Sequence, residues 1–320
     1  MSAEPVVELA SGVRAGDRRA LAKAITLVES TRRGDEATSE ALLAQLLPFT
    51  GRALRLGVSG AAGAGKSSLI EVLGCLAIAE GKRVGVLAVD PSSGVSGGSL
   101  LGDRTRMTRL SSSPTAFVRP SPSAGGEGGL SPRTREVLLV LEAAGYDLIV
   151  VETVGIGQGE LAIADVVDQL VVLWIPGAGD DVQGMKRGIV EYADCVVFGK
   201  ADGERLQATL AARDELQGLF AWMRRDGARV MAVSAHEDRG IAELWTHLEA
   251  RFNALRANGE LDARRRQQRA RWLQLAIERA LLDRAGGNPV FDQQRQHWAA
   301  RVERGEVLPS AAARHLALLL

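Results

Sequence analysis

A glycine-rich octapeptide at residues 60–67, GAAGAGKS, restricts the fold of this chain more than any other segment. It matches G-x-x-x-x-G-K-[ST], a pattern that is meaningful when a strand precedes it and a helix follows it. Both are expected, because the apolar run LRLGVS ends at residue 59 and helical periodicity covers 67–80. Small residues let backbone N–H groups turn inward around phosphate oxygens, and the helix N-terminus adds partial positive charge. The segment predicts a phosphate-binding turn.

The residues of this turn have separate expected roles. Lys66 is expected to reach the β- and γ-phosphates and is a predicted catalytic residue, while the Ser67 hydroxyl is expected to bind Mg²⁺. The full set of predicted nucleotide contacts here is Gly60, Ala61, Ala62, Gly63, Ala64, Gly65, Lys66, Ser67 and Ser68. A phosphate cradle alone does not distinguish kinases, ATPases and GTPases, so other segments must decide between them.

Short apolar runs and helical segments alternate after residue 54. The runs expected to be strands are LRLGVS, RVGVLAVD, DLIVVET, QLVVLWIP, DCVVFGK and RVMAVSA. They are apolar almost throughout, which is typical of strands covered by helices on both faces. Helical periodicity is found between them at 67–80, 132–144, 181–193, 203–225 and 238–257. The pattern predicts an α/β fold, a P-loop NTPase with a mostly parallel, doubly wound sheet.

Helices are also expected along the chain before and after the segments that form this sheet. Apolar and charged positions recur at helical spacing in residues 5–48, and Pro48 ends this expected helical segment. Beyond residue 260 the strands stop, and amphipathic helices broken at Gly286–Pro289 and Pro309 are expected. The expected domains are a helical N-terminal extension, the P-loop domain and a helical C-terminal region, at 1–50, 51–258 and 259–320.

Acidic side chains are found where two predicted strands end. Asp90 closes RVGVLAVD and Glu152 lies near the end of DLIVVET, at the sheet edge where such folds bind ligands. Mg²⁺ takes one or two carboxylates and keeps several waters. Together with Asp103 of GGSLLGDRTRM and the Ser67 hydroxyl, these acids form the predicted metal site. Asp103 and Glu152 are also predicted catalytic residues, and the glycine- and serine-rich loops that follow the strands are expected to act as nucleotide-sensing switches.

Two later segments indicate a site for the base. A carboxylate at Asp202, in the tetrapeptide GKAD, can accept hydrogen bonds from guanine N1–H and its exocyclic amine, which adenine does not offer in that pattern. The Lys200 stem can cover the base face, and a backbone amide near Ala235 can reach O6. A helix N-cap remains the alternative role for Asp202. The predicted base contacts are Lys200, Asp202, Ser234, Ala235 and His236.

Composition argues against several classes of partner. Lys plus Arg and Asp plus Glu both number 39, so no net field attracts the chain to nucleic acid or to an anionic membrane. The run of arginines from Arg264 to Arg271 lacks interleaved aromatic residues, which favours a solvated or partner-facing helix surface. Neither a secretory signal nor a membrane-spanning segment is evident, so a cytoplasmic location is expected. Cys75 and Cys195 are expected to be core residues.

With these residues assembled, the chain resembles the MeaB/ArgK family of GTPases, which are chaperones of adenosylcobalamin-dependent acyl-CoA mutases of the methylmalonyl-CoA mutase type. The resemblance lies in GAAGAGKSS, LAVDPSS, GGSLLGDRTRM, FVRPSPS, VVETVGIGQGE and PGAGDDVQGMKRG, over about residues 50–202. It implies GTP and GDP as ligands with Mg²⁺, a homodimer formed by C-terminal helices, and a mutase partner whose cofactor loading is gated. It also implies a switch at 177–188 that includes Asp180, Gln183 and Lys186.

One position departs from the family pattern. The family has Asn-Lys-x-Asp at the base site, whereas this chain has Gly199 in place of the Asn. One side-chain contact to guanine and to the phosphate loop is therefore expected to be absent, at a cost on the order of 1 kcal/mol. We expect weaker or less selective binding, with GTP still preferred through Asp202.

Slow turnover is expected until a partner binds, because the phosphate motif contains neither an obvious general base nor an arginine finger. Lys186 and Arg106 are the predicted charge stabilisers. A GTP-dependent nickel metallochaperone is an alternative, but it needs a Cys/His cluster, and the histidines here are scattered singly. A small-molecule P-loop kinase is another alternative, with SPRTR as its lid. Protein targeting would need a methionine-rich domain, and the chain has only 5 methionines.

Overall fold

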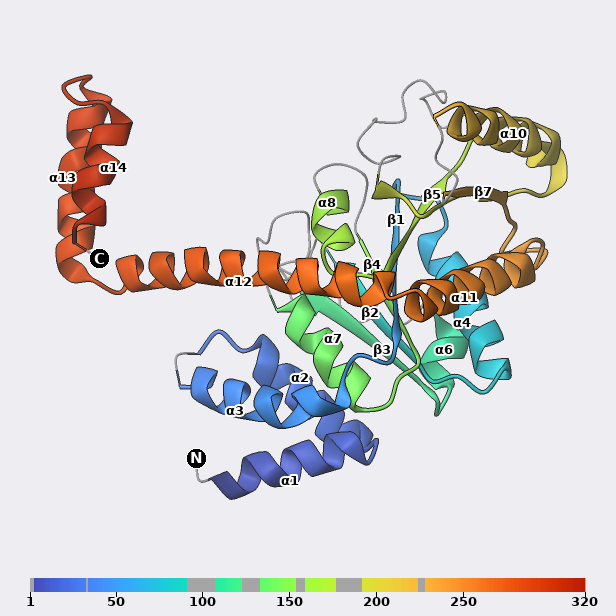
Figure 1. Ribbon diagram of the computed structural model, residues 1–320, viewed down its shortest axis with the longest axis horizontal. Coiled ribbons are helices and arrows are strands. Elements are labelled where there is room, and N and C mark those ends of the chain that lie inside the picture. Colours follow the sequence, from blue (N-terminus) through green and yellow to red (C-terminus); the bar gives the residue numbers. More distant parts are fainter. Residues whose placement is uncertain are drawn as a thin grey trace. The chain divides into compact units, whose positions relative to one another are not determined.

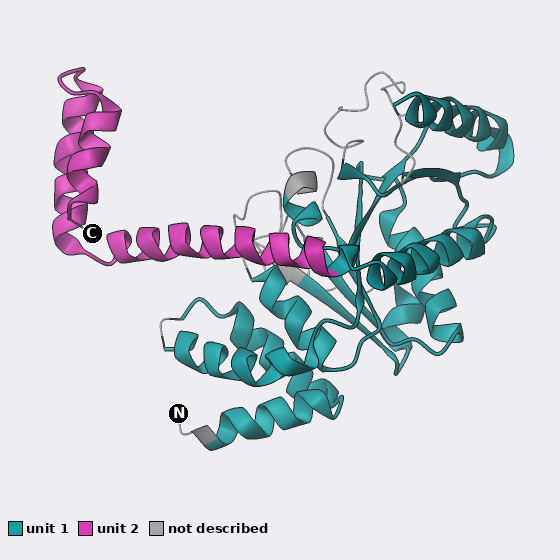
Figure 2. Cartoon of the chain, viewed as in Figure 1, with its two compact units in different colours: residues 1–261 teal, residues 262–320 magenta. Residues whose placement is uncertain are grey.

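The computed structural model of the protein describes residues 3–32, 34–90, 107–122, 133–153, 159–176, 192–223 and 228–319. The chain forms two compact units, residues 1–261 and residues 262–320 (Figure 2). The sequence-based boundaries at residues 50 and 258 remain predictions.

A seven-stranded parallel sheet, counted over the described residues, is the centre of the first unit (Figure 1). The strand order is β3-β2-β4-β1-β5-β6-β7. The strands are β1 Leu54–Gly60, β2 Val84–Asp90, β3 Ala116–Pro122, β4 Leu148–Glu152, β5 Gln169–Trp174, β6 Cys195–Phe198 and β7 Arg229–Ala232. Every strand pairing is parallel, which confirms the predicted α/β class. The phosphate loop follows β1, so the centre of the sheet carries the predicted site.

Strand β3 is not among the strands predicted from the sequence. Its sequence, AFVRPSP, pairs with β2 from Ala116 opposite Val84 to Pro122 opposite Asp90. Two prolines and an arginine interrupt its apolar run, which hides the strand from a pattern search. Proline has no N–H to donate and is tolerated on edge strands, and β3 is the edge of this sheet.

Helices cover both faces of the sheet and enclose two apolar clusters (Figure 1). One cluster lies under α4 Lys66–Ala79, α6 Thr108–Ser112 and α11 Ile241–Ala257. The other lies under α1 Ala3–Arg14, α2 Arg18–Glu29, α3 Glu36–Leu46, α7 Thr134–Ala143, α8 Gly159–Ala164 and α10 Leu206–Trp222. Short 3₁₀ turns, η1 Leu47–Phe49 and η6 Gly203–Arg205, follow α3 and precede α10. Most of the helix expected at 181–193 lies outside the described residues.

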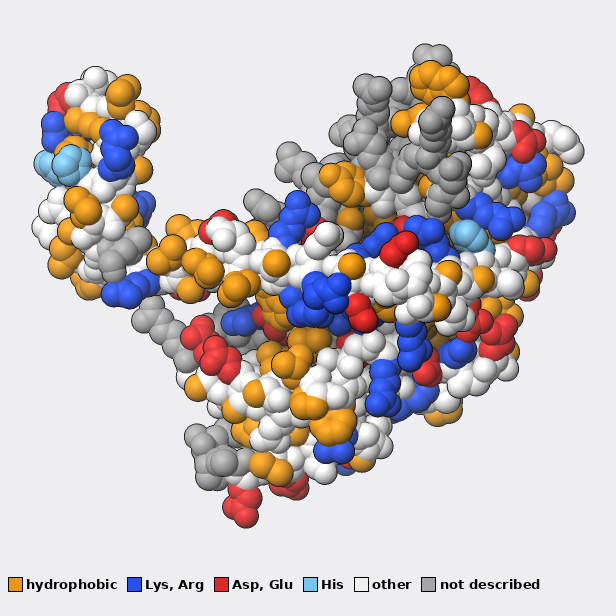
Figure 3. All heavy atoms as spheres, viewed as in Figure 1, with side chains coloured by type: hydrophobic (Ala, Val, Ile, Leu, Met, Phe, Trp, Pro, Cys, Tyr) orange, Lys and Arg blue, Asp and Glu red, His pale blue; other side chains and the backbone are white. Residues whose placement is uncertain are grey.

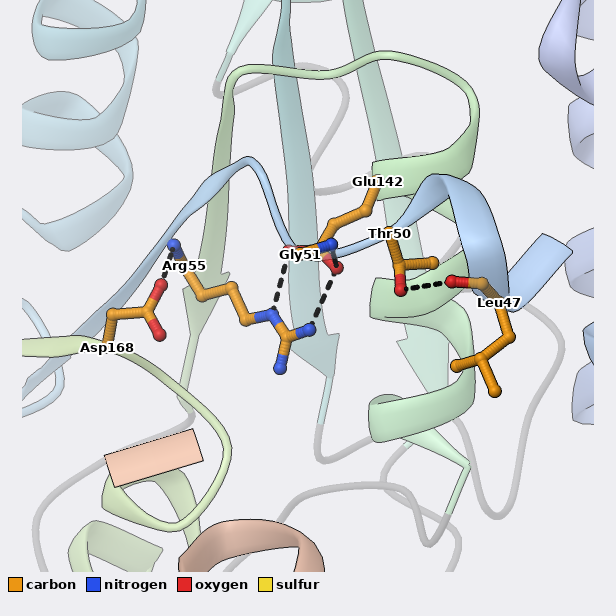
Figure 4. A network of polar contacts seen from close by, with 6 residues as sticks. All are labelled: Leu47, Thr50, Gly51, Arg55, Glu142 and Asp168. Atoms are coloured by element: carbon orange, nitrogen blue, oxygen red, sulfur yellow. Dashed lines mark hydrogen bonds and ion pairs between the residues drawn. The ribbon is translucent and has the colours of Figure 1, made fainter. Parts of the chain in front are cut away.

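A buried ion pair fixes the start of the sheet next to the N-terminal helices (Figure 4). The Arg55 guanidinium donates from Nε and Nη2 to the two carboxylate oxygens of Glu142, at 3.0 and 2.8 Å. The Gly51 N–H donates to the same carboxylate at 2.9 Å, and the Arg55 N–H donates to Asp168 at 2.9 Å. The Glu142 side chain is completely buried, so its charge depends on these partners.

The second unit is helical, as expected. Helix α12, Glu260–Gly286, begins just before the unit boundary, and α13 Pro289–Glu303 and α14 Pro309–Ala317 follow it. The breaks fall at the predicted Gly286–Pro289 and Pro309. Asn288 caps α13 by accepting from the N–H groups of Val290 and Phe291. The Trp298 ring stacks on His315 with ring centroids 4.7 Å apart, which holds α13 and α14 together. No described helix combines the length and apolarity that crossing a membrane requires.

Candidate nucleotide site

The phosphate loop has the backbone shape that its glycines allow. Gly63 and Gly65 have φ angles of 75° and 93°, in the left-handed region that side chains disfavour. Gly60 passes so close to β5 that an added Cβ would lie 2.3 Å from the Leu173 carbonyl oxygen. Gly65 is the N-cap of α4, so the loop leads directly into the helix N-terminus. The strand, turn and helix predicted around this motif are confirmed.

Lys66 folds back onto the loop that it follows. Its ammonium group donates to the carbonyl oxygens of Gly60 and Ala61, at 2.8 and 3.1 Å. The residue is only 8% exposed, and this burial lowers the pKa of its ammonium group, while the nearby Glu152 carboxylate acts in the opposite direction. The cation is thus held within the loop, where phosphate oxygens can replace the backbone carbonyls as its partners.

Ser67 and Glu152 meet beside the loop. The Ser67 hydroxyl donates to Glu152 Oε1 at 2.9 Å, and Glu152 ends β4, the strand next to β1. Strand β2 lies on the other side of β4, with Ala88 opposite Glu152, and Asp90 ends it two residues later. Of Asp90 the structure describes only the backbone. Three of the four residues of the predicted metal site, Ser67, Glu152 and Asp90, therefore belong to neighbouring elements at the carboxyl ends of the central strands.

A cavity of about 400 Å³ opens at the start of α4 and is lined by every predicted base contact except Ser234. It is lined by Ala64, Gly65, Ser68, Leu69, Leu173, Gly199, Lys200, Asp202, Val233, Ala235 and His236. The structure therefore brings together the phosphate loop and both later segments. Leu69, Leu173 and Val233 are not among the predicted site residues. They belong to apolar stretches whose pattern indicates only core packing.

Ser234 fixes the Asp202 carboxylate in this cavity. The buried Ser234 hydroxyl donates a short hydrogen bond to Asp202 Oδ2 and accepts from the Glu237 N–H at 3.1 Å. Asp202 does occupy the N-cap position of η6, but its side chain makes no capping hydrogen bond there. The carboxylate is available to the cavity, so this arrangement can accept two donors from the edge of a base.

The two cysteines are not part of this site. Cys195 is fully buried in β6, and burial raises the pKa of its thiol to about 12, so it is an inert core residue. Cys75 is half-buried on α4, where burial also raises its pKa.

Comparison with known proteins identifies the family. The family model described as methylmalonyl Co-A mutase-associated GTPase MeaB matches residues 21–290. The chain belongs to the MeaB family of GTPases. The predicted family resemblance is thereby confirmed.

Several relatives of this MeaB-family chain are similar over almost its whole length. A probable GTPase of Mycobacterium tuberculosis is 47% identical over 312 residues, which cover 96% of this chain and 93% of that protein. GTPase ArgK of Escherichia coli is 44% identical, over 95% of this chain and 93% of that protein. A mitochondrial methylmalonic aciduria type A homolog of Mus musculus is 40% identical, over 96% and 78%. A crystal structure described as LAO/AO transport system kinase covers 100% of this chain and 98% of its own, with 36% identity and a TM-score of 0.77.

Family membership settles what the phosphate motif alone left open. The chain is a GTPase, and it binds guanine nucleotides. The fold of the MeaB-family chain is that of P-loop proteins, as its similarity to the solved structure also shows.

Some predicted site residues of this MeaB-family chain lie outside the described residues. They are Asp103, Arg106, Asp180, Gln183 and Lys186. Their roles in catalysis, metal binding and switching stay predictions. Among the residues that are described, no group of three or more His, Cys, Asp or Glu side chains could hold a metal ion. A metallochaperone site therefore gains no support from this part of the chain.

Proposed function

We propose that this GTPase is a chaperone that gates cofactor loading into an adenosylcobalamin-dependent acyl-CoA mutase and protects that mutase. The observation that carries the proposal is a nucleotide site with both ends formed and neither a general base nor an arginine finger inside its phosphate loop. Lys66 and Ser67 face the phosphate end, the Asp202 carboxylate faces the base end, and residues 60–68 include neither an arginine nor a general base. Such a site binds GTP but hydrolyses it slowly until another protein completes it.

The choice of mutase follows from similarity. The matching family model names a methylmalonyl Co-A mutase-associated GTPase, and the relative in Mus musculus is named for methylmalonic aciduria. These names support a partner of the methylmalonyl-CoA mutase type for this chain.

We assign the nucleotide contacts from the geometry of the cavity. The loop 60–68 holds the phosphates, with Lys66 turning from its backbone carbonyls to phosphate oxygens. The Asp202 carboxylate accepts from guanine N1–H and the exocyclic amine, and the Ala235 N–H donates to O6. Lys200 and His236 line the same cavity and enclose the base.

Mg²⁺ is the proposed cofactor, and the donor atoms fit it. A hydroxyl at Ser67 and a carboxylate at Glu152, 2.9 Å apart, are the oxygen ligands that this ion prefers. Because Mg²⁺ also takes phosphate oxygens and waters, it does not require a cluster of three acidic residues. Asp90 and Asp103 are the other proposed acids of this site. When bound, Mg²⁺ neutralises negative charge on the β- and γ-phosphates.

Homodimerisation through the C-terminal helices is part of the proposal. Leu273, Ile277 and Leu281 recur at helical spacing on α12 and are 63%, 46% and 48% exposed. Figure 3 shows hydrophobic side chains gathered along this helix. Contiguous exposed apolar surface of this kind marks a protein interface. We place the dimer in the cytoplasm, without nucleic acid or membrane as a partner.

The test is the GTPase rate of the purified protein with and without a candidate mutase. We expect stimulation by the cognate mutase, and co-purification of the two proteins when GTP is present. Lys186→Ala should reduce the stimulated rate much more than the basal rate, because the charge stabiliser is expected to act only in the complex. Equal losses in both rates, or no stimulation by any mutase of this type, would contradict the proposal.

A further inference from the structure

One wall of the base cavity has no side chain that can donate a hydrogen bond. Leu173, Gly199 and Val233 form it, and none of them carries a polar side-chain atom. The backbone does not supply the donor either. The Gly199 N–H already donates to the Trp174 carbonyl and the Val233 N–H to the Phe198 carbonyl, both at 2.8 Å.

Leu173 packs closely beside the position that a side chain at residue 199 would take. A Cβ added to Gly199 would lie 3.1 Å from Leu173 Cδ1 and 3.3 Å from the Ala64 carbonyl oxygen. Both distances are shorter than ordinary van der Waals contact, and Leu173 is only 1% exposed. The wall beside Gly199 is therefore apolar and closed.

The position of this wall indicates which edge of the base it meets. The contact of the added Cβ with Ala64 shows that Gly199 lies next to the phosphate loop. The five-membered ring of guanine carries the ribose and the phosphates, so this ring lies on the phosphate side of the base. Its exposed acceptor is N7, whereas the Asp202 carboxylate takes N1–H and the exocyclic amine on the opposite side.

We propose that this chain recognises guanine through N1–H, the exocyclic amine and O6 alone, and that Gly199 and Leu173 make binding insensitive to N7. The inference rests on the guanine site proposed at Asp202. A guanine N7 that faces an apolar wall accepts no hydrogen bond from the protein. Replacing this nitrogen by C–H therefore removes no hydrogen bond between protein and nucleotide. The substrate class is thus wider than GTP and includes guanine nucleotides in which C–H replaces N7.

Competition against a fluorescent GDP analogue tests this inference. We expect 7-deaza-GTP, in which C–H replaces N7, to bind the wild-type protein within about twofold of GTP. Inosine triphosphate lacks the exocyclic amine and should bind about fivefold or more weakly, because one Asp202 oxygen loses its donor. A wild-type protein that binds 7-deaza-GTP about fivefold or more weakly than GTP overturns the inference.

Variants at position 199 provide the matched control. Gly199→Asn adds an amide donor beside N7, so this variant should prefer GTP to 7-deaza-GTP by about fivefold. Gly199→Ala adds only the Cβ and should discriminate as little as the wild type. An Asn variant without N7 preference counts against the placement of N7 beside Gly199. If the Asn variant does not fold, the wild-type comparison still decides.

Failure of the underlying base site has a different signature. If ATP or inosine triphosphate competes as well as GTP, the guanine site at Asp202 is wrong. If ATP, inosine triphosphate and 7-deaza-GTP all bind much more weakly than GTP, the guanine site at Asp202 stands and only the inference about N7 fails.

Discussion

Asp202 depends on one neighbour for its orientation. Its carboxylate accepts the Ser234 hydroxyl, which is itself fixed by the Glu237 N–H. Without that hydroxyl, the carboxylate would rotate freely at the mouth of the cavity. Ser234 therefore acts on nucleotide binding through Asp202.

Ser234→Ala should weaken GTP binding by on the order of 1 kcal/mol, or about fivefold, through loss of one hydrogen bond to a charged group. Titration of a fluorescent guanine nucleotide measures this. Ser39→Ala is the matched control, because Ser39 is also buried and its hydroxyl has no hydrogen-bond partner. The control should bind GTP as the wild type does. Unchanged affinity in Ser234→Ala would mean that Asp202 is oriented by other contacts.

His247 on α11 makes folding stability depend on pH. Burial lowers the pKa of its imidazole, the positive charges of Arg229 and Arg251 lower it further, and Asp194 opposes them. The unfolded chain then binds more protons than the folded chain between the two pKa values. The stability that the neutral His247 ring contributes is fully present above the pKa that His247 has in the unfolded chain. It is lost as the pH falls through the lower pKa that His247 has in the folded chain.

His247→Gln should flatten this dependence, because glutamine is neutral at every pH. Thermal unfolding of both proteins between about pH 5 and pH 8 measures the difference. We expect the wild-type Tm to fall on acidification more than the Tm of the variant. Parallel profiles would show that His247 does not contribute to the acid sensitivity of the fold.

Among the elements, α6 is held by the helix of the phosphate loop. The buried Glu71 carboxylate of α4 accepts from the N–H groups of Arg109 and Leu110, at 2.6 and 3.3 Å. The two helices touch closely, because a Cβ added to Gly74 would lie 2.9 Å from a Leu110 methyl group. Glu71 thus supplies the acceptor that the first turn of α6 otherwise lacks.

Glu71→Ala should lower the free energy of unfolding by about 2 kcal/mol, because two buried N–H groups lose a charged acceptor. Glu71→Gln should cost less, since its amide oxygen still accepts. Chemical denaturation checks both values. Asp17→Ala is a useful comparison, since Asp17 caps the exposed start of α2 and its loss should cost less than the loss of the buried Glu71. Equal costs at positions 71 and 17 would argue against a special role for the buried cap.

A strand could be predicted from the sequence when its apolar run was continuous. The runs DLIVVET and DCVVFGK form β4 and β6 as predicted, and every residue of these two strands is buried. Strand β3 was missed because its prolines resemble a loop, and only its edge position explains how they are tolerated. The phosphate loop and the two segments predicted for the base could be chosen from the sequence, because their chemistry requires particular side chains at fixed spacing, and they line one cavity. Their contacts with the nucleotide stay predictions. The sequence also marked Gly199 as a departure at the base site, but the packing of Leu173 beside it could not be predicted, because contact across neighbouring strands has no local sequence pattern.

At the scale of the whole molecule, the N-terminal helices complete the core of the first unit. Val13, Leu21, Ile25, Leu42 and Leu46 are at most 1% exposed and share one apolar cluster with the sheet. Polar contacts hold these helices to the edge of the sheet as well. The Arg18 guanidinium donates to the Ala116 carbonyl at 2.8 Å, and Arg119 donates to Glu29 at 2.5 and 3.1 Å.

These contacts make opposite predictions for two truncated proteins. Residues 51–320 lack the N-terminal helices, which pack against α7, so the apolar core cluster that they share with α7 is opened. Burial of the removed side chains is worth on the order of 10 kcal/mol, which is comparable to the total stability of a domain. We expect this protein to lose cooperative thermal unfolding and to bind a dye for exposed apolar surface.

Residues 1–261 keep the complete first unit, so this protein should unfold cooperatively and bind GTP with nearly unchanged affinity. It lacks the exposed leucines and isoleucine of α12, so it should be monomeric in light scattering, whereas the full chain should be a dimer. If residues 51–320 instead melt cooperatively at the Tm of the full chain, the helices before residue 50 are dispensable. The P-loop domain predicted at 51–258 would then fold independently of them, and the shared apolar cluster would contribute little to its stability.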